Sequence, residues 1–401
     1  MRVVLLGLGT VGGAVGARLL DDDWRAYVEA RGLRPPTLLA VGVRDPGRQR
    51  AIDLPASVER TEDLAGLVVR DDVDVVVELI GGLQPAGKLI ERALEAGKSV
   101  VTANKALLAE LGPALERLAR RNLVALRFEA AVAGGIPLLS PLARDLAATR
   151  INGVRGIVNG TTNFILSAMS AGGRGYGEVL ADAQSRGYAE ADPTGDVEGR
   201  DAAHKLVLLT RLAFGVWPQP AGLRRTPATL GGDGSPGISG VSADDIAAAA
   251  EQGLALKLVA FAGRAAGEVS GRLVGWVEPC AVPQRSLLGS TDGVLNAVEV
   301  LGSPLGRVAL QGPGAGGDAT SNAVLADLLS LQRTEDSTWA ALPEALPLRE
   351  LDAGHGQPVR WFWREDGRGC LSEPSTLDNM RTSLAGRLPP DTTLYRVLDE
   401  G

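Results

Sequence analysis

Short apolar runs recur along the first third of the chain, and turns and helical patterns separate them. Residues 2–7 (RVVLLG) predict a buried strand, GLGTVG predicts a turn, and Gly12 to Leu20 predict the beginning of a helix. Further apolar runs predict strands at 37–43, 73–79 and 99–102, with helical patterns such as 88–96 between them. This alternation predicts a parallel, doubly wound sheet that binds its ligands at the carboxyl ends of the strands.

The pattern changes near Arg150, which places a domain boundary at about 130–150. After it, INGVRGIVNGTTNFIL predicts a strand, a turn and the start of a helix instead of another short crossover. Residues 222–242 are rich in Gly, Pro, Ser and Thr and predict a long loop, whereas 270–300 predicts strands. Beyond Leu331 the pattern weakens into a tail that shows no clear strand–helix–strand pairing.

The composition is that of a globular protein without covalent cross-links. The 401 residues are 45% hydrophobic and 22% charged, which is enough for two or three domains. A formal net charge of -7 offers no basic footprint for nucleic acid or an anionic membrane, so we expect small-molecule partners. Cys280 and Cys370 lie far apart without a CxxC or histidine spacing, and we interpret both as incidental thiols.

The first residues superficially resemble a short signal peptide, because Met1-Arg2 precede VVLLGLGTVGGAVGARLL. A signal sequence needs no GxGxxG, whereas a first strand that runs directly into a glycine turn does. No later stretch is apolar for the roughly 18 residues that a membrane span needs. We therefore expect a cytoplasmic protein with no membrane partner.

Lysine is scarce in this chain. Only five of the 41 basic residues are lysine, and arginine supplies the other 36. The five are Lys88, Lys98, Lys105, Lys205 and Lys257. The chain has exchanged lysine for arginine at most positions where a surface cation suffices, so the remaining lysines are enriched for positions that need a compact ammonium or one that can lose its proton. Because histidine is limited to His204 and His355, acid–base chemistry is expected of a lysine or a carboxylate.

Gly7, Gly9 and Gly12 form a GxGxxG turn that also contains Thr10 and Val11. In a dinucleotide fold the first glycine permits the tight turn, the second admits the pyrophosphate, and the third packs the helix on the strand. The usual acid at the end of the second strand is replaced by Arg44. An arginine there suits the 2′-phosphate of NADP, but a solvated charged turn explains it equally well, so NAD stays open.

Thr102-Ala103-Asn104-Lys105 closes a strand at the carboxyl edge of the predicted sheet, where a cofactor and a substrate would meet. Lys105 is therefore a candidate site residue, and the alternative is a surface lysine that begins a helix.

Carboxylates crowd the stretch 187–209 (GYAEADPTGDVEGRDAAHKLVLL) ahead of Lys205. Asp201 and Lys205 are four apart with the acid first, a spacing that brings the side chains together on a helix, and apolar residues follow at once. A lysine held in this way can relay the proton of an alcohol while hydride leaves the same carbon. The alternative is a buried ion pair that holds the helix to a loop. Together these motifs predict a nicotinamide-dependent oxidoreductase.

Six ordered blocks resemble homoserine dehydrogenase, the family that interconverts L-homoserine and L-aspartate 4-semialdehyde with NAD or NADP in threonine, methionine and isoleucine biosynthesis. The blocks are VELIGG at 77–82, TANKALLA at 102–109, EAAVAGGIP at 129–137, GTTNFIL at 160–166, GYAEADPTGDVEGRDAAHKL at 187–206 and QGPGAGGDATSNAVLAD at 311–327. The resemblance covers about residues 1–331.

The resemblance implies roles for individual residues. Lys205 takes the family's acid–base position, and Lys105 takes that of a second lysine near nicotinamide and substrate. Substrate contacts fall on Glu190, Asp196, Asp201, Gly160 and Thr161. Cofactor contacts fall on Gly7, Gly9, Thr10, Val11, Gly12, Arg44, Gly81, Thr102, Lys105, Gly314 and Gly316. A monovalent cation, usually sodium, would be held through one carboxylate and backbone carbonyls by Glu129, Val132, Gly134 and Ile136.

The resemblance also implies an α/β fold class, with a Rossmann-type doubly wound sheet, an α+β catalytic domain and a homodimer. The expected domains are an NAD(P)-binding Rossmann domain at 1–130, a dimerisation region at 131–150 and 300–331, a substrate or catalytic domain at 151–299, and a C-terminal extension at 332–401. The segment Asp21–Pro36 departs from the family by delaying the second strand. The extension is near the size of a regulatory ACT domain, and a degenerate regulatory module and a cover for the dimer explain it equally well.

Two other functions compete with this one. A semialdehyde dehydrogenase of related fold would need a cysteine nucleophile with a histidine partner, and neither cysteine lies in such a motif. A cofactor-binding sensor without turnover would lack Lys205 or Glu190, yet both residues are present.

Overall fold

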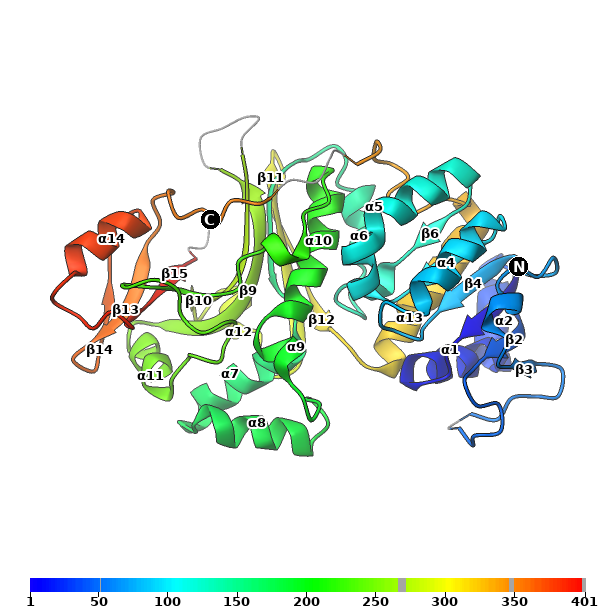
Figure 1. The fold of residues 1–401 in the computed structure, drawn as a ribbon, viewed down its shortest axis with the longest axis horizontal. Coiled ribbons are helices and arrows are strands. Elements are labelled where there is room, and N and C mark those ends of the chain that lie inside the picture. The colour runs from blue at the N-terminus through cyan, green and yellow to red at the C-terminus, as the bar shows by residue number, and fades with distance from the viewer. Residues whose placement is uncertain (51, 266–271, 346–349, 399–401) are drawn as a thin grey trace. The chain divides into compact units, whose positions relative to one another are not determined.

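The computed structural model describes residues 1–50, 52–265, 272–345 and 350–398. It divides into two compact units (Figure 1). The first comprises Met1–Ala148, Gly215–Trp217 and Pro313–Pro347, and the second comprises Thr149–Phe214, Pro218–Gly312 and Leu348–Gly401, as far as these segments are described. In the described parts of the chain no helix is both long and apolar enough to cross a membrane.

A six-stranded parallel sheet forms the centre of the first unit. Its strands are β1 (Arg2–Leu6), β2 (Thr37–Gly42), β3 (Glu59–Thr61), β4 (Val75–Glu78), β5 (Ser99–Thr102) and β6 (Leu126–Arg127). The helices of this unit are α1 (Thr10–Leu20), α2 (Asp22–Ala30), α3 (Leu64–Leu67), α4 (Ala86–Glu95), α5 (Lys105–Asn122), α6 (Leu139–Ala143) and α13 (Gly317–Thr334). The strands and the helix predicted from the apolar runs are confirmed, with ends that shift by one or two residues.

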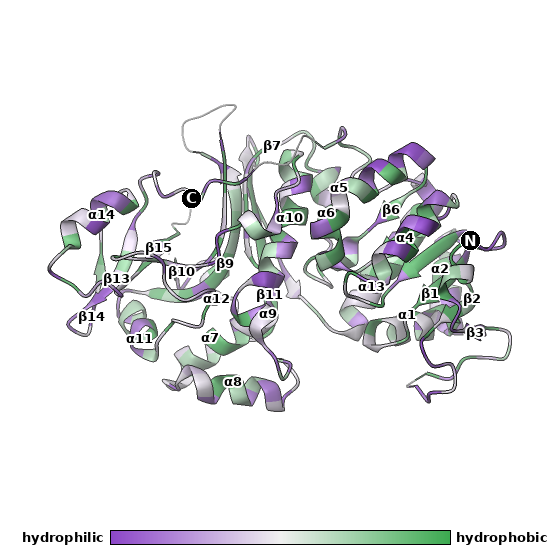
Figure 2. Cartoon of the chain, in the orientation of Figure 1, coloured by the Kyte–Doolittle hydropathy of each residue, from purple (hydrophilic) through white to green (hydrophobic). Residues whose placement is uncertain are grey.

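The strand order β3-β2-β1-β4-β5-β6 is that of a Rossmann sheet. From β1 the chain adds β2 and β3 on one side and then β4, β5 and β6 on the other, so the strand order switches between β1 and β4. Ligands of such sheets bind at the carboxyl ends of the strands on either side of this switch point. Buried apolar residues occupy all of β1 after its first position. Figure 2 shows the contrast between these hydrophobic strands and α4, which carries both hydrophilic and hydrophobic residues. The predicted doubly wound sheet is therefore confirmed.

Helix α2 explains why the second strand comes late. It occupies most of the segment Asp21–Pro36, for which no element was expected. The Asp21 side chain accepts a hydrogen bond from the backbone N–H of Asp23 and so caps the helix. Only Val28 of this helix is buried, so the segment lacks the apolar stripe by which helices are recognised in a sequence.

A mixed sheet of nine strands forms the second unit, in the order β12-β11-β7-β9-β10-β15-β13-β14, with β8 paired to β15. Its strands are β7 (Arg150–Ile157), β8 (Ala228–Thr229), β9 (Leu254–Arg264), β10 (Leu273–Pro283), β11 (Leu295–Ser303), β12 (Gly306–Pro313), β13 (Trp361–Glu365), β14 (Arg368–Leu371) and β15 (Thr393–Val397). Its helices are α7 (Gly160–Gly172), α8 (Tyr176–Ser185), α9 (Thr194–Val197), α10 (Arg200–Phe214), α11 (Ala243–Glu251), α12 (Leu287–Ser290) and α14 (Leu377–Leu384). The strand and helix start expected after Arg150 are β7 and α7.

The tail is more regular than its sequence pattern indicates. It contributes β13, β14, α14 and β15, and β15 lies between β10 and β13 in the large sheet. The sequence shows no clear strand–helix–strand pairing in this segment, yet the folded tail contains strands and a helix. Its short strands bury aromatic residues and the arginine Arg396, whose guanidinium lies between the rings of Trp276 and Trp361. Buried arginine and tryptophan do not produce the apolar alternation that predicts a strand.

Candidate active site

A cavity of about 1140 Å³ lies beside the glycine turn of the first unit, at the carboxyl ends of β1, β2 and β4. Of the expected cofactor residues, those that line it are Gly7, Gly9, Thr10, Arg44 and Gly81. Those not among its described lining residues are Val11, Gly12, Thr102, Lys105, Gly314 and Gly316. Arg48 and Arg50 join Arg44 on its wall, where Asp45 is also present, so three arginines and one aspartate line this part of the cavity.

The three glycines of the turn differ in what constrains them. Gly7 has a φ of +98°, and its N–H donates to the Gly42 carbonyl oxygen at 2.9 Å. A Cβ atom on Gly12 would press on the Gly7 carbonyl oxygen, whereas a Cβ on Gly9 would meet nothing within 4 Å. The protein itself therefore requires the first and third glycines, and the surface at the second is left open to a ligand.

Glu78 organises the carboxyl edge of β4 and β5, and no sequence argument singled it out. Its carboxylate is fully buried and accepts hydrogen bonds from the N–H groups of Ile80 and Gly81 and from the Thr102 hydroxyl, at 2.6–3.0 Å. Thr102 Oγ1 in turn accepts from the N–H of Asn104 at 3.0 Å. This network holds the cavity-lining turn after β4.

Lys105 begins α5 directly after that network. Asn104 is the N-cap residue, and its side chain accepts from the N–H of Leu107 at 3.2 Å and donates to the Gly82 carbonyl oxygen at 2.7 Å. The strand end predicted around Thr102 and the helix start at Lys105 are both observed.

Lys205 lies buried on α10 in the second unit, with 8% of its surface exposed. Its ammonium donates to the Val158 carbonyl oxygen at 2.6 Å and pairs with Asp201 Oδ2 at 2.8 Å. The pairing predicted from the four-residue spacing is therefore present. Asn159 donates from Nδ2 to the same Asp201 oxygen at 2.9 Å and to Asp196 Oδ1 at 2.7 Å. One amide thus links both carboxylates to the lysine.

The Asp196 carboxyl lies half-buried on α9, beside this amide. Burial raises its pKa, an effect that the Asn159 hydrogen bond opposes and the negative charge of Asp201 reinforces. A positively charged group placed between the two carboxylates would relieve both the burial cost and the repulsion. The arrangement therefore favours an ammonium ligand.

The remaining expected substrate residues lie on α7 and on the segment before α9. A Cβ on Gly160, the first residue of α7, would lie 2.7 Å from the Val294 carbonyl oxygen, so this position requires close backbone packing. The Thr161 hydroxyl donates to the Tyr188 carbonyl oxygen at 2.7 Å. Glu190 is exposed on the segment that follows α8.

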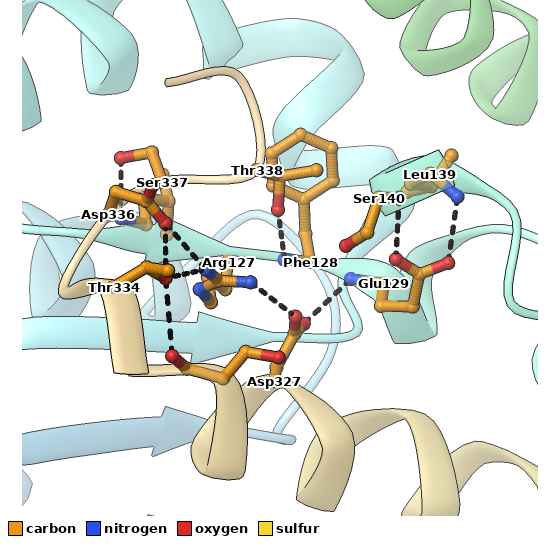
Figure 3. A network of polar contacts seen from close by, with 12 residues as sticks. Arg127, Phe128, Glu129, Leu139, Ser140, Asp327, Thr334, Asp336, Ser337 and Thr338 are labelled. Atoms are coloured by element: carbon orange, nitrogen blue, oxygen red, sulfur yellow. Dashed lines mark hydrogen bonds and ion pairs between the residues drawn. The ribbon is translucent and has the colours of Figure 1, made fainter. Parts of the chain in front are cut away.

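Glu129 lies buried at the end of β6 in the first unit, between α6 and α13 (Figure 3). Its carboxylate accepts hydrogen bonds from the N–H groups of Leu138, Leu139 and Ser140 at 2.6–2.8 Å. Its own N–H donates to Asp327 Oδ2 at 2.8 Å. These bonds hold the loop between β6 and α6 at both ends.

Asp327 is buried on α13 next to Arg127 and Glu129. Burial and, after it, the Glu129 charge raise its pKa to about 7, against the opposing effect of the Arg127 guanidinium. Arg127 is itself buried and donates to Thr334 Oγ1 and Asp336 Oδ1 at 2.9 and 2.6 Å (Figure 3).

The loop residues fit a monovalent cation held through oxygen. Ala133 and Gly134 have φ values of +54° and +37° and form a tight turn, and a Cβ on Gly134 would lie 2.6 Å from the Gly314 carbonyl oxygen. The Glu129 carboxylate has about four acceptor positions, of which three are used.

A metal site can also be built from several side chains. Among the described residues, no group of three or more His, Cys, Asp or Glu side chains could hold a metal ion. The loop donors are mainly carbonyl oxygens, which suit hard, weakly charged ions better than zinc or iron.

The late glycine loop leads into α13. Gly316 has a φ of +112° and is the N-cap residue of that helix. A Cβ on Gly317 would lie 3.3 Å from the Thr10 carbonyl oxygen, so the start of α13 packs closely on the cofactor turn. Gly314 and Gly316 thus approach the cofactor region through the start of α13, although they do not line the cavity.

Cys280 does not offer a nucleophile for the competing semialdehyde dehydrogenase reaction. It is fully buried on β10, and burial followed by the Glu278 charge raises the pKa of its thiol well above the usual value. A thiol of this kind remains protonated and inert.

Two family models account for most of the chain. The model described as homoserine dehydrogenase matches residues 137–329, and the model described as homoserine dehydrogenase, NAD binding domain, matches residues 7–129. The chain belongs to the homoserine dehydrogenase family. It is therefore an NAD(P)-dependent oxidoreductase that interconverts L-homoserine and L-aspartate 4-semialdehyde.

Similar proteins and solved structures are homoserine dehydrogenases as well. A homoserine dehydrogenase of Synechocystis is 42% identical over 331 residues, which is 82% of this chain and 73% of the relative. One of Pseudomonas aeruginosa is 37% identical over 387 residues, or 94% of this chain and 85% of the relative. The crystal structure of a homoserine dehydrogenase from Thiobacillus denitrificans superposes with a TM-score of 0.87 at 32% identity and covers 100% of this chain and 99% of that chain. This structural similarity extends over the C-terminal tail as well.

Several residues whose hydrogen bonds hold the candidate site together were not singled out from the sequence. Glu78, Asn104, Asn159 and Asp327 all lie inside the six blocks that resemble the family or next to them, but their partners come from distant parts of the chain. One signal could have revealed Glu78, namely a carboxylate that ends an apolar strand at the edge where ligands bind.

Proposed function

We propose that Lys205 is the acid–base catalyst of homoserine oxidation. The supporting observation is the buried arrangement in which its ammonium contacts both Asp201 and the Val158 carbonyl oxygen. In the neutral form Lys205 takes the hydroxyl proton of homoserine, and in the reverse direction it returns that proton to the aldehyde oxygen. The chemistry that a bound nicotinamide would supply is acceptance of the hydride from the same carbon.

The substrate's amino group is bound between Asp196 and Asp201 in this proposal, since both carboxylates already converge on one Asn159 amide. Glu190, Gly160 and Thr161 complete the substrate contacts. Lys105 acts as the second lysine beside nicotinamide and substrate, and it supplies positive charge for the developing alkoxide.

Replacement of Lys205 by arginine tests the role of proton transfer. Arginine keeps the charge and cannot act as a base, so kcat should fall by about 10²–10⁴-fold while the variant folds and binds cofactor. The reaction is followed by the absorbance of NADPH or NADH formed on adding L-homoserine. Lys88→Arg is the matched control, because Lys88 is exposed and should tolerate the change. Near-normal turnover of Lys205→Arg would move the role to Lys105.

We propose NADP as the preferred cofactor, with Arg44 contacting the 2′-phosphate. Support comes from its place on the cavity wall together with Arg48 and Arg50. The substitution Arg44→Ala should raise KM for NADP about tenfold or more, which corresponds to at least about 1.4 kcal/mol, and change KM for NAD little. Equal effects on both cofactors would contradict the proposal.

We propose a sodium site on the loop of Glu129, Val132, Gly134 and Ile136. If this is correct, sodium chloride should raise the Tm more than choline chloride at the same ionic strength. Substitution Glu129→Gln should reduce that difference, and its absence in the unchanged protein would rule the site out.

We further propose that the enzyme acts as a cytoplasmic homodimer whose contacts come from 131–150 and 300–331. β12 is an edge strand of the large sheet with alternating exposed residues, and such edges are usually covered. A molar mass of one chain by light scattering would contradict the dimer.

A further inference from the structure

Lys257 is a buried lysine for which the catalytic proposal has no use. It lies on β9, paired with Cys280 of β10, and 3% of its side chain is exposed. In a chain that uses arginine for nearly all its cations, a lysine kept in such a position needs a physical reason.

Four acceptors converge on the Lys257 ammonium. They are the Thr291 carbonyl oxygen at 2.7 Å, Asp292 Oδ1 at 3.0 Å, Asn163 Oδ1 at 3.1 Å and Ser167 Oγ at 3.2 Å. The three N–H donors of an ammonium sit on one nitrogen, and two of the four acceptors around that nitrogen share a donor, whereas a guanidinium spreads its donors over a plane. The geometry of this site thus explains why arginine does not replace the lysine.

The acceptors belong to two segments that Lys257 joins. Asn163 and Ser167 lie on the first turns of α7, and Thr291 and Asp292 begin the loop before β11. The Asn163 amide strengthens the junction, because it donates to the carbonyl oxygens of Thr291 and Leu295 at 3.0 and 3.2 Å. Ser167, Lys257 and Asp292 are also among the residues that line a cavity of about 330 Å³ beside the junction.

The loop held by Lys257 also supports the start of α7. Gly160 packs against the Val294 carbonyl oxygen so closely that a Cβ would lie 2.7 Å from it. Asn159, the N-cap residue of α7, is the residue that bonds Asp196 and Asp201. A shift of the 291–295 loop would therefore displace the turn that orients the carboxylates around Lys205.

We propose that Lys257 is a positioning residue for the homoserine site, acting through Asn163 and the 291–295 loop on the first turn of α7. This inference rests on the proposed roles of Asn159, Asp196 and Asp201. It assigns Lys257 no contact with substrate or cofactor.

Replacement of Lys257 by methionine keeps the length of the side chain and removes its donors. The homoserine KM should rise, and kcat/KM should fall on the order of tenfold to a hundredfold, as expected when a catalytic arrangement is misplaced slightly. The Kd for NADPH, measured by fluorescence titration, should stay within about twofold because the cofactor cavity lies in the first unit. Lys257→Arg should resemble Lys257→Met, since charge alone does not place donors at one point among the four acceptors.

A control separates positioning from general destabilisation. Val274→Ala truncates a buried residue on β10, six positions from the residue paired with Lys257, and should lower Tm without changing the homoserine KM. KM does not depend on the fraction of enzyme that is folded. A lowered Tm with an unchanged homoserine KM in Lys257→Met would overturn the proposal.

A second variant keeps the test decisive if Lys257→Met does not fold. Asn163→Asp keeps an oxygen for Lys257 and removes the donors to the Thr291 and Leu295 carbonyl oxygens. It should raise the homoserine KM in the same direction, and an unchanged KM would refute the role of the loop. Failure of the catalytic proposal is recognised separately, by near-normal turnover of Lys205→Arg.

Discussion

His355 shows how strongly one residue's ionisation depends on surrounding charge. Burial, together with the nearby guanidinium groups of Arg224, Arg396 and Arg381, lowers its pKa to about 4, while Asp233 opposes this shift. An unfolded histidine titrates near pH 6.5. Between about pH 6.5 and 4 the unfolded chain therefore binds a proton that the folded chain does not.

Stability should consequently fall as pH decreases through this window, and His355→Gln should remove that contribution. Urea unfolding followed by tryptophan fluorescence is suitable, because Trp276 and Trp361 flank Arg396 close to this cluster. From pH 7 to pH 5 the unchanged protein should lose more free energy of unfolding than the variant. Parallel losses would show that His355 is not held neutral.

At this scale the sequence predicts pairs within one helix and misses partners between segments. The Asp201–Lys205 pair follows from a spacing of four and is observed at 2.8 Å. Asn159 was not singled out, because its carboxylate partners lie on α9 and α10, more than thirty residues later along the printed sequence. Lys257 was recognised as unusual from lysine scarcity alone, but its four acceptors depend on how α7 and β11 pack.

In the turn between β1 and α1, the glycine that the fold requires can be distinguished from the glycine that a ligand requires. Gly12→Ala would press a methyl group on the Gly7 carbonyl oxygen, whereas Gly9→Ala would place one in open space. Gly12→Ala should therefore lower the free energy of unfolding without ligand, on the order of 1–3 kcal/mol. Gly9→Ala should leave it unchanged and raise the cofactor Kd about tenfold or more.

Thermal unfolding without cofactor and a fluorescence titration with NADPH measure the two effects independently. Loss of stability in Gly9→Ala would mean that the second glycine also serves the fold. Unchanged cofactor affinity in that variant would mean that the backbone at Gly9 does not closely approach the pyrophosphate of the cofactor.

Elements were predictable where a single physical preference dominated. β1 and β4 bury nearly every residue and therefore appear in the sequence as continuous apolar runs. Helix α2 buries only Val28, and the tail strand β15 includes a buried arginine, so neither has the periodicity of its class. Their existence depends on capping and on ion pairing with residues elsewhere in the chain.

On the scale of the whole molecule, the tail is part of the second unit's sheet. β15 runs parallel to β10 and antiparallel to β13, so the strands β13 and β14 reach the rest of the sheet through it. Arg396 of β15 donates to Glu278 Oε2 at 3.0 Å, and Arg224 donates to the other oxygen at 2.9 Å. A tail that served as a regulatory module or as a cover for the dimer would therefore have to act while integrated in the second unit's sheet.

Removal of the tail should therefore damage the catalytic unit and not release a separable module. A chain that ends at residue 345 would lose β15, expose the edge of β10 and leave Glu278 with one of its two arginine partners. Thermal unfolding should show a lower Tm for the second unit together with reduced homoserine turnover. Full activity at an unchanged Tm would show that the tail is dispensable for the fold.

A point substitution isolates the charge component of this attachment. Arg396→Met should cost about 3–5 kcal/mol, because it leaves a buried carboxylate short of a partner and removes the cation from between Trp276 and Trp361. The double variant Arg396→Met with Glu278→Gln removes the uncompensated charge and should recover part of that loss. Measured by urea unfolding, equal stability of the single and double variants would locate the attachment in the aromatic contacts and the strand pairing instead of in the ion pair.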